Sequence, residues 1–138
     1  MVEFKSFDEC HIDAAHALWA ATEWASVSQA DEPNALKAFF ARNPECSWIA
    51  ESAGRLIGTV LAGHDARRGY IYHLVVVEGE RGKGIGRTLL NRALNSLREA
   101  GITKCHAIVL DGNPAADFFW SPQGWHAQNT TQFSRFLV

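Results

Sequence analysis

Glycines and basic residues are concentrated in one short segment, Arg81-Gly82-Lys83-Gly84-Ile85-Gly86-Arg87. Glycine at every second position lets the backbone turn tightly and direct successive N–H groups at one point. The helix expected to begin there adds its unpaired amides and the positive end of its dipole. Together with three cationic side chains, these groups predict a binding site for an anion the size of a pyrophosphate.

Two well-known phosphate-binding motifs do not fit this segment. The P-loop motif requires a serine or threonine after its lysine, whereas Lys83 is followed by Gly84. The dinucleotide-binding motif requires the spacing G-x-G-x-x-G, whereas the spacing here is G-x-G-x-G. The alternative is a glycine-rich turn without a ligand, which would crowd three cations together for no gain.

The elements around this segment must position it. The run Tyr70–Val77 is apolar at nearly every residue, which predicts a central strand covered on both faces. An apolar stripe at helical spacing begins at Ile85 and ends near Gly101, which predicts a helix. Upstream, Ala53-Gly54 separates two β-prone runs and predicts a hairpin. The strands expected there are 47–52 and 55–64.

The remaining patterns predict alternating strands and helices around one sheet. The other expected strands are 2–7, 104–110 and 130–138, and the other expected helices are about 8–20, 33–43 and a short one after Asn113. With 138 residues, the chain has the length of a single domain, 1–138. The order of elements predicts an α+β or mixed α/β fold.

Three pieces of the sequence match one family pattern. Arg81-x-x-Gly84-x-Gly86 follows the apolar strand Tyr72–Val77, and Asn113-x-x-Ala116-x-x-Phe119-Trp120 precedes Gly124-Trp125. This combination resembles the GNAT superfamily, the Gcn5-related N-acetyltransferases, over nearly the whole chain. The resemblance implies a twisted, mixed and mostly antiparallel sheet with flanking helices, in which the fourth and fifth strands splay apart.

The resemblance also implies acetyl-CoA as the acyl donor, with its pantetheine arm between the splayed strands, and no metal. Strand backbone would pair with the arm, the glycine segment would hold the pyrophosphate, and Asn113 would contact the arm or the acceptor side. The donor-binding residues expected on this basis are Leu74, Val75, Val76, Arg81, Gly82, Lys83, Gly84, Ile85, Gly86, Arg87 and Asn113.

Acetyl transfer to an amine requires loss of a proton from the ammonium, attack on the thioester and stabilisation of the leaving thiolate. A backbone N–H near Val76 is expected to polarise the carbonyl. Tyr70 and Tyr72 occupy positions where relatives often carry the base; each either orders a water that relays the proton or lines the acceptor surface. His73 is a further candidate for the base, because its residue type titrates nearer neutral pH, but strand alternation predicts that it faces away from Tyr72. The alternative is a core histidine satisfied by a hydrogen bond.

Two further residues are candidates for catalysis. Glu23 lies between Trp19 and Trp24 in the sequence, which suits an amine site with a carboxylate for the cation and aromatic rings around it. The alternative is that Glu23 is a solvated surface acid and the two tryptophans are core residues. Trp120 stands where relatives often place a tyrosine as general acid. Its indole N–H is not a useful acid, so Trp120 either donates a hydrogen bond to the sulfur or forms a wall of the channel.

The charge distribution favours a small anion and a cationic acceptor as ligands. Residues 1–54 carry three bases against nine acids, residues 81–104 carry six bases against one acid, and the whole chain carries −2. Nucleic acid is therefore not expected as a partner. Without an 18-residue apolar run or a signal sequence, and with three widely spaced cysteines, the sequence predicts a cytoplasmic protein that does not enter a membrane.

The sequence thus predicts direct acetyl transfer from acetyl-CoA to a primary amine on a small molecule or a peptide. Another acyl-CoA, such as propionyl- or succinyl-CoA, stays open as the donor. The alternative from a different class is a non-catalytic acyl-CoA sensor, which Trp120 and the lack of an obvious base favour. Dimers are common in the family that this sequence resembles, but no feature of this sequence predicts one.

Overall fold

The computed structural model describes residues 1–114 and 116–138, without the side chains of residues 116 and 117. Ala116, which belongs to the family pattern, is therefore described by its backbone alone. The chain divides into two compact units, residues 1–108 and residues 109–138. The first unit contains the sheet and the three α-helices, and the second contains short helical turns and an extended tail.

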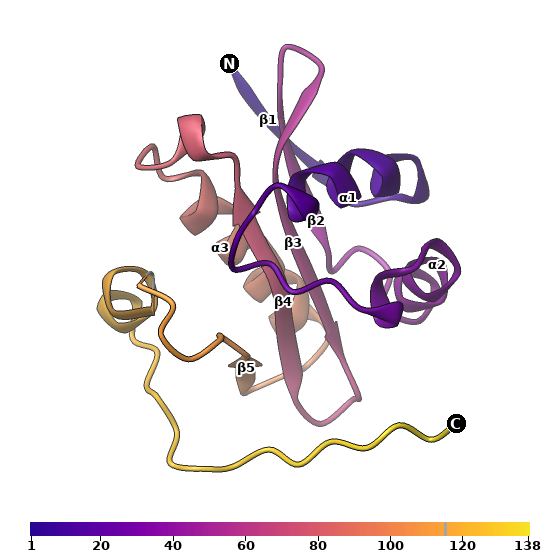
Figure 1. Ribbon diagram of the computed structural model, residues 1–138, viewed down its shortest axis with the longest axis vertical. Coiled ribbons are helices and arrows are strands. Elements are labelled where there is room, and N and C mark those ends of the chain that lie inside the picture. The colour runs from indigo at the N-terminus through magenta and orange to yellow at the C-terminus, as the bar shows by residue number, and fades with distance from the viewer. Residues whose placement is uncertain (115) are drawn as a thin grey trace. The chain divides into compact units, whose positions relative to one another are not determined.

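The first unit is built on a five-stranded sheet in the order β1-β2-β3-β4-β5 (Figure 1). The strands are β1 Val2–Ser6, β2 Trp48–Ser52, β3 Arg55–His64, β4 Gly69–Val76 and β5 Cys105–Ala107. The first four are antiparallel, and β5 runs parallel to β4. The β4–β5 pairing ends at Ile71 and Ala107, so the predicted mixed sheet, open between these strands, is confirmed.

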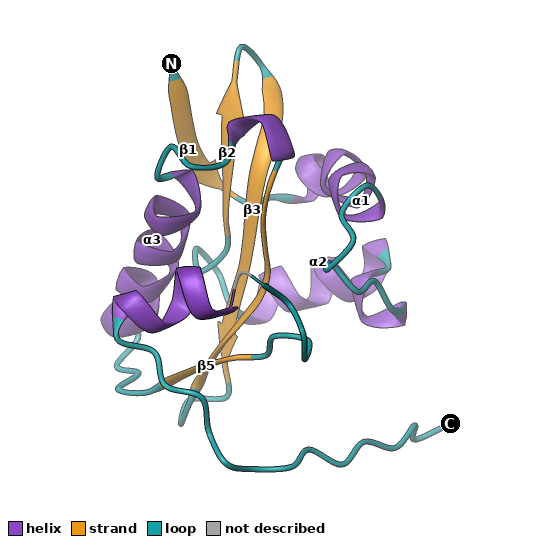
Figure 2. Cartoon of the chain, turned by 60° about the vertical axis from the view of Figure 1, so that its left-hand side comes forward, coloured by secondary structure: helices purple, strands orange, loops and turns teal. Residues whose placement is uncertain are grey.

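Helices cover both faces of this sheet. Helices α1 Ile12–Ala20 and α2 Pro33–Arg42 pack on one face, and α3 Ile85–Glu99 packs on the other (Figure 2). The predicted apolar stripe of α3 is buried through Leu89, Leu90, Ala93 and Leu97. On the opposite face, Trp19 of α1 and Leu36 of α2 are each 1% exposed in one hydrophobic cluster. Burial of these apolar side chains is the main force that holds the layers together.

The predicted hairpin between β2 and β3 is confirmed, and its turn explains the sequence. Ala53 has φ 51° and Gly54 has φ 75°, so both central residues are left-handed. Two left-handed residues are characteristic of the tight type I′ turn, whose twist matches that of the flanking strands. The turn thereby sets the register in which Ser52 faces Arg55.

A β-bulge interrupts β4 at His73. Leu61 of β3 faces Tyr72, and Thr59 faces Val75, so two residues of β4 oppose Val60 alone. His73 has a φ of 45°. The extra residue resets the alternation of side chains. The rings of Tyr72 and His73 therefore both lie on the sheet face that α1 and α2 cover. The prediction that His73 faces away from Tyr72 is therefore wrong.

The end of the chain differs from the sequence-based prediction. The strand expected at 104–110 is limited to Cys105–Ala107, and residues 125–138 form neither helix nor strand, so the expected strand 130–138 is wrong. Phe133 and Phe136 are 93% and 72% exposed. Their β-propensity alone does not make a strand, because a strand requires a hydrogen-bonded neighbour. The short helix after Asn113 is a π-helical turn, Ala116–Trp120, followed by the 3-10 turn Ser121–Gln123.

None of the helices in the described part of the chain combines the length and the hydropathy needed to cross a membrane.

Candidate functional site

The glycine-rich segment 81–87 runs from the loop after β4 into the first turn of α3, and we call it the glycine loop. Gly82 and Gly84 have φ of 80° and 82°, a left-handed conformation that favours glycine, and Gly84 immediately precedes the first turn of α3. A Cβ placed on either glycine would meet no atom within 4 Å. Backbone amides next to a helix N-terminus thus border free space, which is the arrangement that binds phosphate.

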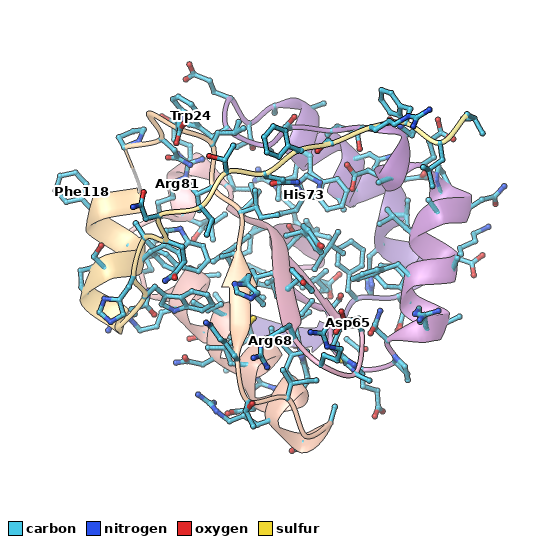
Figure 3. The ribbon with its side chains drawn as sticks, turned by 90° about the horizontal axis from the view of Figure 1, so that it is seen from below. Trp24, Asp65, Arg68, His73, Arg81 and Phe118 are labelled. Atoms are coloured by element: carbon cyan, nitrogen blue, oxygen red, sulfur yellow. The ribbon has the colours of Figure 1, made fainter. Side chains whose placement is uncertain are left out.

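The cationic side chains of this loop are partly engaged already. Arg81 Nε donates a hydrogen bond of 3.0 Å to the carbonyl oxygen of Val76, and Lys83 Nζ lies 2.9 Å from a carboxylate oxygen of Glu80. Arg87 is exposed, and among the described residues it has no ion pair. Arg81 lies in the segment that links β4 to α3 (Figure 3). The charges therefore surround the glycines, and Arg81 and Lys83 each keep further N–H donors besides the ones already engaged.

The edge of β4 beyond Ile71 is open toward the diverging strand. Gly69 N–H donates to Lys104 C=O on the β5 side, and Val77 N–H donates to Ile57 C=O of β3. Because strand residues alternate, the backbone groups of Leu74 and Val76 point away from β3. Those of Val75 point toward β3, where Val75 faces Thr59. The backbone groups of Leu74 and the N–H of Val76 thus face the open edge, whereas the Val76 carbonyl already accepts the hydrogen bond from Arg81.

Aromatic rings cover the sheet on the α2 side of this opening. Tyr70 and Tyr72 stack with ring centroids 6.3 Å apart, Phe39 of α2 meets Tyr72 edge-on at 6.4 Å, and His106 of β5 lies 5.5 Å from Tyr70. Tyr72 remains 38% exposed. Burial, with smaller contributions from Tyr70 and Cys105, raises the pKa of Tyr72. Tyr72 is therefore a neutral phenol at physiological pH, able to donate a hydrogen bond but not to act as a phenolate base.

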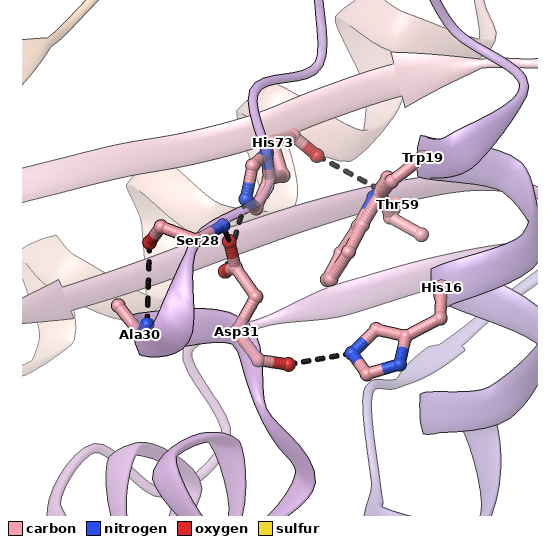
Figure 4. A network of polar contacts seen from close by, with 7 residues as sticks. All are labelled: His16, Trp19, Ser28, Ala30, Asp31, Thr59 and His73. Atoms are coloured by element: carbon pink, nitrogen blue, oxygen red, sulfur yellow. Dashed lines mark hydrogen bonds and ion pairs between the residues drawn. The ribbon is translucent and has the colours of Figure 1, made fainter.

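A polar network connects α1, the turn before α2 and the bulge of β4 (Figure 4). His73 Nε2 lies 3.0 Å from Asp31 Oδ1, and the His73 ring stacks on Trp19 at 4.4 Å. Trp19 Nε1 donates to Thr59 Oγ1 at 2.9 Å, and this hydroxyl donates to His73 C=O at 2.8 Å. The network holds the imidazole in one orientation.

Of the other predicted catalytic residues in the first unit, Glu23 takes no part in this network. Glu23 is exposed in the loop after α1, and Trp24 is 39% exposed. Trp19 is 1% exposed, so it is a core residue and does not line an amine site. Asn113 and Trp120 belong to the second unit, where Trp120 packs edge-on against Trp125 with ring centroids 4.9 Å apart.

The pairing of His73 with Asp31 is the feature that sequence reasoning missed. Residues 23–34 show no hydrophobic period, and the strand pattern of β4 does not reveal a bulge. One local signal was present: Ser28-x-x-Asp31 has a capping-box spacing, which predicts a turn there. In the structure, Ser28 N–H donates to Asp31 Oδ2 at 3.0 Å. The turn fixes Asp31, but only the tertiary fold brings His73 to it.

Comparison of the sequence with known proteins finds one family. The sequence model of the acetyltransferase (GNAT) family matches residues 12–125. An acetyltransferase of Yersinia enterocolitica is 29% identical over 96 residues, which are 70% of this chain and 68% of that protein.

Solved structures share the fold at low sequence identity. The PaiA N-acetyltransferase of Thermoplasma acidophilum, in complex with coenzyme A, has a TM-score of 0.80 at 18% identity, over 95% of this chain and 93% of that one. AAC(6')-Iy, in complex with the bisubstrate analog CoA-S-monomethyl-acetylneamine, has a TM-score of 0.78 at 13% identity, over 100% and 99%. The architecture of this chain is thus shared with proteins crystallised with CoA or a CoA conjugate.

Proposed function

The chain belongs to the acetyltransferase (GNAT) family, and we propose that it transfers an acetyl group from acetyl-CoA to a primary amine of a small molecule or peptide. One observation carries the proposal: a glycine-built helix N-terminus that borders free space follows, after one 3-10 turn, a strand whose outer edge is open. A ligand with a pyrophosphate at one end and an amide-containing arm at the other matches both features.

Donor binding is proposed to use mainly backbone groups. The amides of Gly82 through Arg87 bind the pyrophosphate, with Arg81, Lys83 and Arg87 as the surrounding cations. Leu74 and Val76 pair with the arm as a neighbouring strand would. The free space at Gly82 and Gly84 supports this fit, because a side chain there would occupy the position of the phosphates. The roles that family membership suggests for Asn113 and Trp120 stay predictions.

The acceptor is proposed to bind on the aromatic surface of β4. Tyr70 and Tyr72 offer ring faces to an ammonium or to apolar groups next to it. The acidic balance of residues 1–54, to which Glu23 contributes, draws a cation toward this face. A protein of the same fold, AAC(6')-Iy, was crystallised with the bisubstrate analog CoA-S-monomethyl-acetylneamine, which supports an arrangement of donor and acceptor side by side.

Transfer is proposed to occur by direct attack of the amine on the thioester carbonyl. A route through an acetylated cysteine is not favoured, because burial raises the pKa of the Cys105 thiol to about 11. That thiol is protonated and weakly nucleophilic at neutral pH. A backbone N–H at the open edge of β4 polarises the carbonyl, and Tyr72 orders water at the acceptor.

The test is a calorimetric titration of the protein with acetyl-CoA, free CoA and ATP, followed by assay of CoA release with a panel of amines. We expect micromolar binding of acetyl-CoA, little binding of ATP and turnover of at least one amine. Absence of binding to either CoA species would overturn the proposal. Saturable acetyl-CoA binding without turnover of any amine would instead favour the non-catalytic sensor.

A further inference from the structure

His73 is held in a backbone conformation that its own side chain does not favour. A left-handed φ of 45° in a non-glycine residue persists only where surrounding contacts enforce it. Here Thr59 Oγ1 donates to the His73 carbonyl at 2.8 Å, and the imidazole stacks on Trp19. Such enforced conformations cluster at functional sites, which points to a functional role for this imidazole.

Asp31 fixes one nitrogen of this imidazole. The residue is 6% exposed, its Oδ1 lies 3.0 Å from His73 Nε2, and its Oδ2 accepts the Ser28 N–H. A buried carboxylate requires hydrogen-bond donors, so Nε2 carries a proton and donates it to Asp31. The backbone carbonyl of Asp31 is in turn hydrogen-bonded to Nε2 of His16.

The other nitrogen, Nδ1, is left with an open lone pair. Among the described residues Nδ1 has no hydrogen-bond partner, and the structure contains no fully buried side-chain nitrogen or oxygen that lacks one. Nδ1 therefore reaches solvent, consistent with the 12% exposure of the His73 side chain. The bulge places it on the same face as Tyr72, one residue before Leu74, whose backbone faces the open edge of β4.

We propose that His73 Nδ1 is the base that deprotonates the acceptor amine and that Asp31 is its positioning residue; this rests on the proposed function. The ammonium gives one proton to Nδ1 and becomes a neutral amine. The amine nitrogen then forms a bond to the thioester carbonyl carbon, the carbon–sulfur bond breaks, and CoA leaves as a thiolate. The nitrogen loses its second proton to the thiolate, and the imidazolium returns its proton to solvent, which regenerates the site.

An Asp–His pair of this kind increases the rate in two ways. The carboxylate keeps the proton on Nε2, so that Nδ1 is always the acceptor, and it stabilises the imidazolium that forms. The titratable groups that face His73 are Asp31 from the turn before α2 and, through the Asp31 carbonyl, His16 from α1; Tyr72 adjoins it on β4. Of these, only Asp31 contacts the imidazole with a carboxylate.

The test compares His73→Gln, His73→Gly and Asp31→Asn with the wild type, using acetyl-CoA and the fastest amine among butylamine, 2-phenylethylamine, an alanyl peptide and a lysyl peptide. For His73→Gln, kcat falls by about 100-fold or more, while calorimetric affinity for acetyl-CoA stays within about threefold. The pH profile of kcat/KM in the wild type contains the rise that a general base produces, and the variant loses this rise. His73→Gly suits the left-handed φ, and added imidazole restores part of its rate.

The controls separate a base from a structural residue. His64→Gln replaces a histidine at the end of β3 that lies outside this network, and its kcat and pH profile should match the wild type. Asp31→Asn should lower kcat and displace the pH profile. If the wild type is active and His73→Gln has the same rate and pH profile, the role of His73 as the base is overturned, but the proposed function is not. Absence of acetyl-CoA binding or of turnover in the wild type would overturn the proposed function as well.

Discussion

The glycine loop and the His73–Asp31 network are two ways to build a site within one unit of this protein. The loop is exposed, and its binding groups are backbone amides shaped by left-handed glycines. The network is largely buried, with only His73 Nδ1 reaching solvent among its proposed reacting groups, and it is built from side chains of α1, the turn before α2, β3 and β4. The first is encoded in consecutive residues, whereas the second exists only after the chain has folded. Donor binding and proton transfer should therefore respond differently to substitution.

The largest expected effect comes from a carboxylate placed in the glycine loop. Gly84→Asp adds a negative charge where amides face free space and forces a Cβ into a left-handed residue. Loss of two charge-assisted hydrogen bonds predicts acetyl-CoA affinity at least about 100-fold weaker, measured by calorimetry. Gly54→Asp is a matched control, because Gly54 also has a positive φ and free space but lies in the hairpin turn. Equal losses in both variants would show that backbone strain, not the anion site, is responsible.

A substitution where β3 packs against α2, on the same sheet face as the network, should affect stability and not donor binding. A Cβ at Gly63 would lie 2.7 Å from Phe39 Cζ and from Asn43 Nδ2, closer than packed atoms allow. Gly63→Ala should therefore lower the free energy of unfolding by about 1–3 kcal/mol, measured by urea denaturation. Gly79→Ala, where a Cβ meets no atom within 4 Å, should stay within about 0.5 kcal/mol of the wild type. If Gly63→Ala leaves the free energy of unfolding unchanged, α2 can shift to accept a methyl group.

Removal of two cations tests whether the glycine loop binds the phosphates of CoA. Arg81→Ala combined with Lys83→Ala should weaken CoA by about tenfold. The same variant should weaken pantetheine, which has no phosphate, by less than about twofold. Competition against a fluorescent CoA analogue measures both affinities. If both ligands lose affinity equally, the two residues shape the open edge of β4 and do not bind the phosphates.

The smallest expected effect concerns the aromatic surface. Tyr72→Phe removes the hydroxyl but keeps the ring that packs against Tyr70 and Phe39. With His73 as the base, kcat/KM for the fastest amine should fall by about threefold or less. A loss of more than tenfold, together with a changed pH profile, would assign the proton relay to the tyrosine. Tyr70→Phe serves as the neighbouring control, because its ring occupies the same stack.

Much of the fold could be predicted from local sequence patterns. The Ala53-Gly54 turn, the start of α2 at Pro33 and the apolar stripe of α3 each depend on residues close in sequence. The glycine loop was predicted for the same reason. The bulge at His73 was not, because it depends on how β3 and β4 pair over distant residues. Asp31 was missed since only tertiary contacts reveal that a turn residue is buried beside an imidazole.

The hydrogen bond from Arg81 to the Val76 carbonyl has a consequence for solubility. An open strand edge offers unpaired N–H and C=O groups to any other extended chain and is a common starting point for aggregation. Here a long cationic side chain occupies one acceptor of the edge, and the adjacent bulge interrupts its regular pattern. The edge that must stay unpaired to receive a ligand is thereby protected against self-association before the ligand arrives.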